Sequence, residues 1–260
     1  MIRLVRELYQ YRGLLLSLVQ RELKARYRGS FLGFLWTFLN PTLHMMVYAL
    51  LFTVVMRQNI PSFPYFMFVG LLPWLWFASS LGGGASAISD RRDLMTKVRF
   101  PAQVLPTTVV LTNLSNYLLS LPLMVGLGLF YGQTPTWHIL AFPVVVAIQL
   151  VFTLALTYIL AAINVTFRDL QHIVTNLLTM WFFMTPVLYP VSTIQDGPLR
   201  DVVMTLNPMS SLLVSYQAIF YEHRWPDPAP LALLAVFSVV LLWGASSIFE
   251  SRREDFAESI

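Results

Sequence analysis

The chain has 260 residues, of which 57% are hydrophobic and only 12% are charged, and its net charge is +4. Soluble domains carry about 25% charged residues, so this composition excludes an ordinary soluble protein and indicates a membrane protein. The absence of cysteine excludes a disulfide framework, a thiolate metal site and a cysteine nucleophile.

The N-terminal segment, residues 1–33, is strongly basic. Within 13–30, apolar side chains recur at intervals of three and four, which places them on one face of a helix: Leu16, Val19, Leu23 and Tyr27. Basic side chains occupy another face. The pattern predicts an amphipathic helix that lies in the membrane interface, with its bases near anionic headgroups. The simpler alternative is a basic flank that only sets the topology.

Six apolar segments follow, each close to the 20 or so residues that a membrane-spanning helix needs. None contains Asp, Glu, Lys or Arg, and they cover roughly 35–56, 64–87, 104–130, 138–163, 171–189 and 229–249. The fifth is the least regular, because Pro186 and Pro190 lie at its end and proline interrupts helical hydrogen bonding. We therefore expect an all-α polytopic membrane protein with six transmembrane helices.

Lysine and arginine are distributed unevenly between the connections. Fourteen of the 17 lie on the side of the N-terminus and three on the other side. Cytoplasmic loops are enriched in these residues, so both termini are predicted to be cytoplasmic. An even number of spans agrees with this orientation.

Two cytoplasmic connections carry mixed charge. In "SDRRDLMTKVRFP" (89–101), Ser89 can cap a short helix and Asp90 and Asp93 fall in its first turn, where the helix dipole favours them. This segment predicts a docking surface, or alternatively a solvated loop whose charges only set topology. "NVTFRDLQH" (164–172), with Arg168 and Asp169, is a second candidate contact.

The outer connection 190–228 contains a further helical pattern, "NPMSSLLVSYQAIFY" (207–221). Asn207 is a suitable N-cap and Pro208 suits the first helical position. Its apolar and aromatic surface allows it to dip back into the outer leaflet if protein shields its ends. The alternative is an ordinary helix outside the membrane.

Several kinds of chemistry are missing from the sequence. The two lysines, Lys24 and Lys97, do not follow glycine, so there is no P-loop and ATP hydrolysis must come from a partner. His44 lies alone within the first apolar span, where a histidine is more often structural than a proton relay. Ser86 in "LGGGASAISD" (81–90) lacks the G-x-S-x-G pattern of a nucleophile elbow. Its glycines indicate close helix packing or local unwinding.

Aromatic residues are dense in "MWFFMTPVLYP" (180–190). Tryptophan and tyrosine commonly form belts at membrane interfaces, and this remains one interpretation. The other is a lining that conducts sugars, whose apolar faces stack on aromatic rings.

Four motifs together resemble the membrane subunits of ABC-2 type polysaccharide exporters, which export O-antigen, teichoic acid and capsule in bacteria. They are "LVQRELKARYRGSFLGFLWTFLNP", "DRRDLMTKVRFPAQVLP", "NVTFRDLQHIV" and "NPMSSLLVSYQAIF". The resemblance covers nearly the whole chain and is closer to the O-antigen and teichoic-acid types than to the capsule type.

The resemblance implies one transmembrane domain over 1–260, with an interface helix (1–33), a coupling helix (89–101) and re-entrant gate helices between spans five and six (190–228). It implies a homodimer in the bacterial cytoplasmic (inner) membrane, with two ATP-binding cassette subunits that bind ATP and Mg, so that this chain holds no cofactor or metal. The implied substrate is a glycan on undecaprenyl diphosphate, and no nucleic acid is involved.

The resemblance also assigns roles to individual residues. The residues expected to couple to the ATPase are Asp90, Arg91, Arg92, Asp93, Leu94, Arg168 and Asp169. Those expected to contact the substrate headgroup at the interface are Arg21, Lys24, Arg26, Tyr27 and Arg28. Those expected to line the pore or gate are Trp36, Tyr48, Trp181, Phe182, Phe183, Tyr189 and Tyr216.

Four hypotheses remain from the sequence. The first is an ATP-driven exporter of O-antigen or a similar polysaccharide, and the second is an ABC-2 permease for a teichoic acid, capsule, drug or small lipid. The third is a membrane enzyme such as a lipid-linked sugar transferase, and the fourth is a non-catalytic scaffold.

Overall fold

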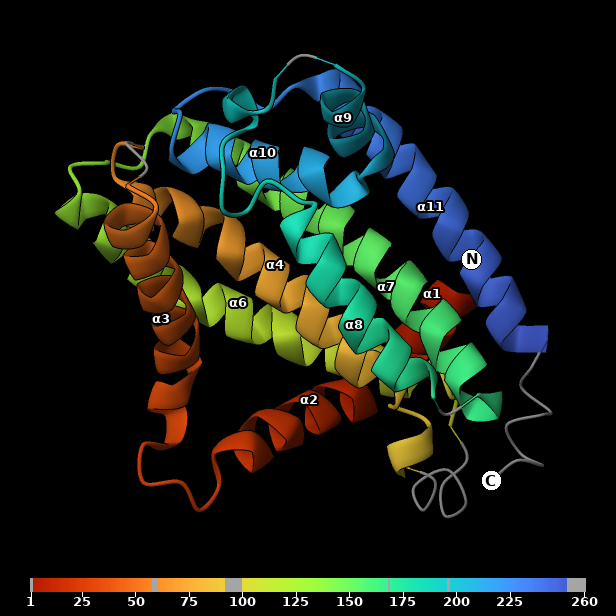
Figure 1. The fold of residues 1–260 in the computed structure, drawn as a ribbon. Helices are drawn as coiled ribbons and strands as arrows, with labels where there is room; N and C mark the ends of the chain where they lie inside the picture. The colour runs from red at the N-terminus through yellow and green to blue at the C-terminus, as the bar shows by residue number, and fades with distance from the viewer. Residues whose placement is uncertain (1, 58–59, 92–99, 168, 196, 252–260) are drawn as a thin grey trace.

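The computed structural model describes residues 2–57, 60–91, 100–167, 169–195 and 197–251, and all regular structure in these ranges is helical (Figure 1). The α-helices are α1 (Ile2–Gln10), α2 (Arg12–Tyr27), α3 (Trp36–Ala49), α4 (Phe63–Ala85), α6 (Val104–Phe130), α7 (Phe142–Thr166), α8 (Leu170–Phe183), α9 (Pro198–Asp201), α10 (Pro208–Phe220) and α11 (Pro228–Ser251). Two π-helical segments, Leu50–Val55 and Val202–Leu206, continue α3 and α9, and short 3₁₀ turns occupy Gly33–Leu35, Ser89–Arg91, Trp137–Ala141 and Val191–Thr193.

Five of the six predicted spans coincide with helices that are long and apolar enough to cross a membrane. They are Gly33–Val55, Phe63–Ala85, Val104–Phe130, Trp137–Thr166 and Pro228–Ser251. The expectation of an all-helical membrane protein is therefore confirmed in the described part of the chain.

The span predicted over 171–189 is the exception. Its helix, α8, ends at Phe183, and 14 residues reach only about 21 Å, which is less than the thickness of a bilayer core. Turns follow α8, because a proline disfavours helical geometry in the residue before it and Pro186 cannot donate a helical hydrogen bond. The prediction of a helix to residue 189 was therefore wrong in its last third.

Helix α4 is the centre of the bundle, where it contacts α3, α6, α7, α8 and α10. It approaches α7 most closely at Gly84, where a Cβ atom would lie 2.1 Å from Thr157 Cγ2. Because α4 is continuous to Ala85, the glycines of 82–84 do not unwind the helix, and Gly83 and Gly84 serve close packing.

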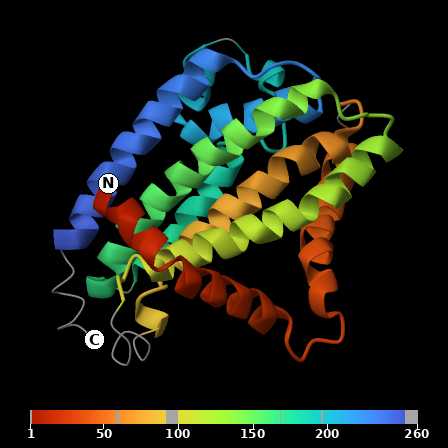
Figure 2. The ribbon, with the colours of Figure 1, turned by 180° about the vertical axis from the view of Figure 1, so that it is seen from behind.

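One end of the bundle gathers segments from the whole chain. Leu4 of α1 packs in one apolar cluster with Ile88 after α4, Val165 of α7 and Phe249 of α11. Figure 2 shows α1 lying across the last turns of α11 at this end. The described chain therefore begins and finishes at the same end of the bundle.

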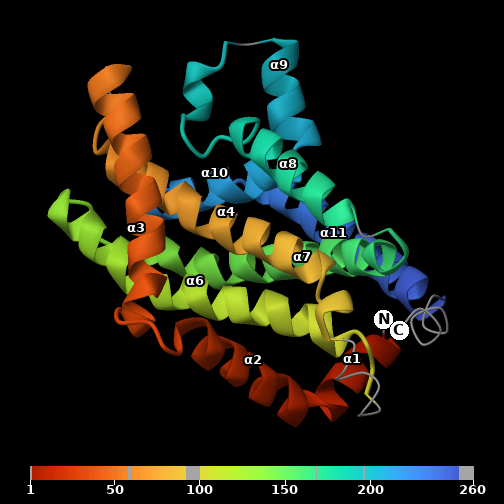
Figure 3. The same cartoon turned by 60° about the horizontal axis from the view of Figure 1, so that its bottom comes forward.

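Helices α3 and α11 occupy opposite edges of the bundle (Figures 1 and 3). In Gly33–Val55 only 6% of the most apolar stretch is buried, against 72% in Phe63–Ala85. The surface of α3 is therefore available to lipid or to another subunit.

The corner between α2 and α3 depends on two glycines. Gly29 has φ +80° and Gly33 has φ +47°, and a Cβ atom at either position would meet nothing within 4 Å. Glycine is favoured there by backbone conformation and not by close packing.

Candidate functional site

Helix α2 confirms the predicted helix in 13–30, but its buried face is shifted by one residue. Leu15 and Val19 are buried, whereas Leu16 is 57% exposed, and the helix packs against α6. The bases Arg21, Lys24, Arg26 and Arg28 are exposed. The side chain of Tyr27 lies outside the described set.

Arg26 connects α2 to α6. Its Nη2 donates to Asn113 Oδ1 over 3.3 Å, and Asn113 is only 4% exposed. Among the predicted headgroup residues, this arginine is thus held against the bundle by a buried amide that the sequence analysis did not single out.

The predicted coupling segment begins with a single 3₁₀ turn, Ser89–Arg91. Arg91 forms an ion pair with Glu22 of α2, and Ser86 Oγ donates to Asp90 Oδ2 over 2.7 Å. Ser86, and not Ser89, is therefore the hydroxyl that contacts the first carboxylate of this segment. Glu22 was missed, because nothing local in the sequence relates it to a residue 69 positions away.

The other predicted coupling residues are described only in part. Arg92, Asp93, Leu94 and Arg168 lie outside the described residues. Asp169 immediately precedes α8, and its carbonyl accepts from the backbone N–H groups of His172 and Ile173.

The aromatic residues at the end of α8 contact α4, α3 and α10. Trp181 packs against Phe77, with ring centroids 5.2 Å apart, and its Nε1 donates to Asn207 Oδ1 over 2.8 Å. Phe182 is buried between Trp74 and Tyr48, each 5.6 Å away between centroids. Phe183 is 58% exposed.

Asn207 joins α8 to α10. Its Oδ1 caps α10 by accepting from the N–H of Met209, as predicted from the sequence. Its Nδ2 donates to Thr185 Oγ1 over 2.9 Å. This one side chain therefore fixes the start of α10 against the turn after α8.

Two predicted lining tyrosines have different environments. Tyr189 is partly exposed and donates to the carbonyl of Phe183. Tyr216 is fully buried and donates to Gln149 Oε1 over 2.8 Å, while Gln149 donates to the carbonyl of Pro73. Tyr216 exposes no surface, so its side chain lies in the interior of the helix bundle.

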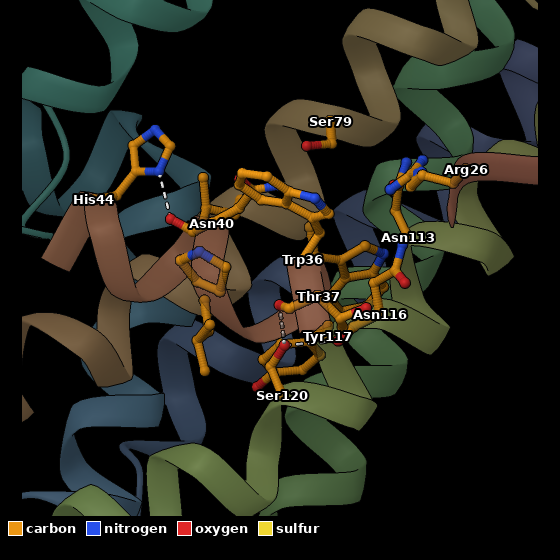
Figure 4. Close-up of a pocket in the computed structure, with 14 residues that line it drawn as sticks. Arg26, Trp36, Thr37, Asn40, His44, Ser79, Asn113, Asn116, Tyr117 and Ser120 are labelled. Atoms are coloured by element: carbon orange, nitrogen blue, oxygen red, sulfur yellow. Dashed lines mark hydrogen bonds between the residues drawn. The ribbon is translucent and has the colours of Figure 1, made fainter. Parts of the chain in front are cut away.

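A pocket of about 430 Å³ lies between the end of α2 and helices α3, α4 and α6 (Figure 4). Trp36 lies on it, and its Nε1 donates to Ser30 Oγ over 3.0 Å. His44, a histidine within the first predicted span, faces the same pocket, and its Nδ1 lies 2.8 Å from the carbonyl oxygen of Asn40. The pocket is lined by Arg26, Trp36, Thr37, Asn40, Pro41, His44, Leu72, Leu75, Trp76, Ser79, Asn113, Asn116, Tyr117 and Ser120.

Most residues of this pocket were not predicted from the sequence, although asparagines within the apolar spans gave an indication of it. Asn40, Asn113 and Asn116 lie in otherwise apolar spans, where polar side chains normally face a protein interior or a water-filled cavity. In the described part of the chain, no three His, Asp or Glu side chains gather to hold a metal ion.

Comparison with known proteins finds a matching family and several similar proteins. The family model of the ABC-2 type transporter matches residues 13–221. The O-antigen export system permease protein RfbA of Myxococcus xanthus is 81% identical over 260 residues, covering 100% of both chains. A Klebsiella pneumoniae protein of the same name is 31% identical over 94% of each chain. The polysialic acid transport protein KpsM of Escherichia coli is 23% identical over 92% of this chain and 93% of its own.

The matched region begins at α2 and ends just after α10, so it includes the pocket, the coupling turn and the aromatic end of α8. The chain therefore belongs to the ABC-2 type transporter family, as a membrane subunit whose ATPase is a separate protein.

Proposed function

We propose that this chain is the membrane subunit of an ATP-driven exporter that moves undecaprenyl-diphosphate-linked O-antigen across the bacterial inner membrane. The observation that carries the proposal is its 81% identity, over the full length of both chains, to a protein named as an O-antigen export permease. The polar pocket and the basic α2 helix are consistent with a substrate that has a glycan and a charged headgroup.

The proposed topology is a single transmembrane domain over 1–260 with six crossings and both termini in the cytoplasm. The joint apolar cluster of α1 and the end of α11 supports an even number of crossings. In this arrangement α8 and the turns after it make the fifth crossing. Helix α10, whose residues are mostly buried against α4 and α7, is the re-entrant element of the gate region 190–228.

The proposed assembly is a homodimer with two ATP-binding cassette subunits. The exposed apolar surface of α3 supports a neighbour of the same kind, because a span with so little burial has most of its surface free for contact. ATP and Mg bind to the cassette subunits, which dock beneath the coupling segment 89–101 and Asp169.

The exposed bases of α2 are the proposed contact for the substrate's diphosphate. Arg21, Lys24, Arg26 and Arg28 lie on the helix that leads directly into the first span. Arginine is well suited to phosphate because its planar guanidinium donates two parallel hydrogen bonds. If export stays normal when Arg21 and Arg28 are both replaced by neutral residues, α2 has an anchoring role only.

The proposed pathway between protomers uses the aromatic side chains that expose surface. Phe183 is the last residue of α8 and Tyr189 follows the helix. Trp36 and Tyr48 lie on α3 and are partly buried. Trp181 and Phe182 belong mainly to the packing between α8 and α4, so their role in the pathway is to support the wall.

A second candidate substrate class is a capsule-type polysaccharide, which the similarity to KpsM over 92% of the chain favours. Deletion of the gene separates the two. The O-antigen proposal expects undecaprenyl-linked glycan to accumulate on the cytoplasmic face and surface O-antigen to disappear, with both restored by the intact gene. Normal surface O-antigen together with a lost capsule would support the second candidate instead.

A further inference from the structure

The pocket between α2, α3, α4 and α6 has the composition of a binding site for a neutral sugar. It lies within one protomer and extends inward from the end of α2, with Arg26 beside Asn113 at one side and His44 at the other (Figure 4). At 1.5 Å per residue, Asn113 and Ser120 lie about 14 and 24 Å from the start of α6. The pocket therefore reaches well into the membrane-spanning part of the bundle.

Polar side chains are numerous in the lining of this pocket, although it is built from apolar spans. Three carboxamides, two serines and a threonine line it, and Arg26 is the one arginine or lysine among the lining residues. Carboxamides and hydroxyls both donate and accept hydrogen bonds, as sugar hydroxyls do. A pocket for a lipid tail has no need of these groups.

A buried donor on one of the lining residues has no partner. Trp76 is 2% exposed, and its Nε1–H meets no hydrogen-bond acceptor among the described residues. Buried polar groups in folded proteins nearly always have a partner, so a solitary indole N–H on a pocket wall points to an acceptor that arrives with a ligand or water. The Trp76 ring stacks on Tyr117 with the planes 12° apart, which holds the donor in place.

Size and shape agree with this chemistry. A volume of about 430 Å³ falls within the range of small-molecule sites. Trp36 contributes an aromatic surface from α3, and its indole is oriented by the hydrogen bond to Ser30. A flat apolar ring beside amide and hydroxyl groups matches a sugar, which has apolar faces and a polar rim.

We propose that this pocket is a glycan subsite that holds a sugar unit of the lipid-linked substrate inside each protomer. The proposal rests on the proposed export function and extends it by naming where a sugar is recognised. Arg26, at the side of the pocket nearest α2, is then placed to contact a phosphate while Asn40, Asn116 and Trp76 contact the sugar.

The test uses the full chain reconstituted in nanodiscs with its ATPase. Two probes are compared: undecaprenyl diphosphate carrying a short O-antigen glycan, and undecaprenyl diphosphate without sugar. Two variants change the pocket: Ser79→Leu fills it, and Asn40→Leu removes an amide from its lining. Two control variants, Thr42→Leu on α3 and Ser115→Leu on α6, add similar bulk outside the pocket.

The pocket variants are expected to raise the concentration of the glycan probe that half-maximally stimulates ATP hydrolysis by about tenfold or more. The sugar-free probe and the two controls should show no change. An equal loss for both probes would indicate a lipid or diphosphate site, and an unchanged response to the glycan probe would show that the pocket binds no sugar. Either result overturns the proposal.

A second measurement uses the unmodified protein and does not depend on the folding of a variant. A glycan probe with a photoreactive group on its sugar should cross-link to the pocket segments of α3, α4 or α6, and excess unlabelled probe should compete. Cross-links confined to other segments would contradict the subsite. If neither probe stimulates ATP hydrolysis by the unmodified complex, the proposed export function itself is contradicted. If ATP hydrolysis is stimulated normally but no cross-links form in the pocket, only the glycan subsite is contradicted.

Discussion

Arg91, in the turn after α4, forms an ion pair with Glu22 on α2. This contact joins the predicted coupling segment to the basic helix, 69 residues apart in sequence. The resemblance to ABC-2 type exporters assigns Arg91 to the ATPase interface. Its ion pair with Glu22 suggests a second hypothesis, in which Arg91 sets the position of the predicted coupling segment relative to α2.

An exchange of charges separates these two roles. Glu22→Arg and Arg91→Glu should each reduce stimulation of the ATPase several-fold, and the double variant should recover most of it if the pair positions the segment. Stability should change little, because ion pairs that are partly exposed contribute about 0–1 kcal/mol. ATP turnover of the reconstituted complex is the measurement.

The charge-exchange experiment has a clear opposite outcome. If Arg91 binds the ATPase directly, the double variant will remain as defective as Arg91→Glu. Arg57→Glu, which changes the same charge in the connection between α3 and α4, serves as the control and should leave turnover unchanged.

The close approach of α4 and α7 predicts unequal effects for neighbouring glycines. Gly84→Ala should lower stability by about 1–3 kcal/mol, because its Cβ would overlap Thr157 and force the helices apart. Gly82→Ala, where a Cβ meets nothing within 4 Å, is the matched control. Thermal unfolding in detergent measures both, and equal unfolding temperatures for the two variants would contradict the packing argument.

The hydrogen bond from Trp181 to Asn207 predicts a structural effect at the C-terminal end of α8. Trp181→Phe should destabilise the protein by about 1 kcal/mol through the lost hydrogen bond, with a further loss from the smaller ring. Asn207→Leu should cost more, because it also removes the cap of α10.

Trp137→Phe provides the control for these variants, since Trp137 is 75% exposed. Its unfolding temperature should match that of the unmodified protein. Protease sensitivity in the segment 184–207 should rise in the Trp181 and Asn207 variants alone. Unchanged sensitivity there would show that the contact does not hold α10 in place.

The buried Tyr216–Gln149 contact predicts non-additive energetics. Tyr216→Phe leaves Gln149 Oε1 without its donor and should cost about 1–3 kcal/mol. Gln149→Leu also removes the bond to the Pro73 carbonyl. A double variant whose loss is clearly smaller than the sum of the single losses is expected, and a simple sum would show that the two side chains act independently.

Local features of the sequence were enough to predict several parts of the structure. The spans that contain α3, α4, α6, α7 and α11 follow from uninterrupted apolar runs in the sequence. The Asn207 cap follows from an Asn-Pro pair at the start of an apolar helix. These features depend on neighbours along the chain. The early end of α8 was signalled by Pro186, although its position was misjudged.

The remaining features depend on contacts between distant segments. The Glu22–Arg91 pair, the Arg26–Asn113 bond and the pocket are formed by residues from separate helices, and their relative positions are set by packing. The burial of Tyr216 likewise depends on Gln149, which a single helical pattern cannot reveal. Asparagines inside apolar spans were the one available sign of the pocket.

The corner at Gly29 and Gly33 and the slight burial of α3 both affect how α3 is oriented in the isolated chain and in the assembled transporter. Helix α2 is attached to the bundle through Arg26 and Glu22, whereas α3 leaves it at Gly29 and Gly33 with few of its apolar residues covered. Contacts with α4, α6 and α8 cover one side of α3, including that between Tyr48 and Phe182, whereas most of its apolar surface has no partner within the chain. The tilt of α3 therefore depends both on these contacts and on its neighbours in the membrane, and it should differ between the solitary subunit and the complete complex.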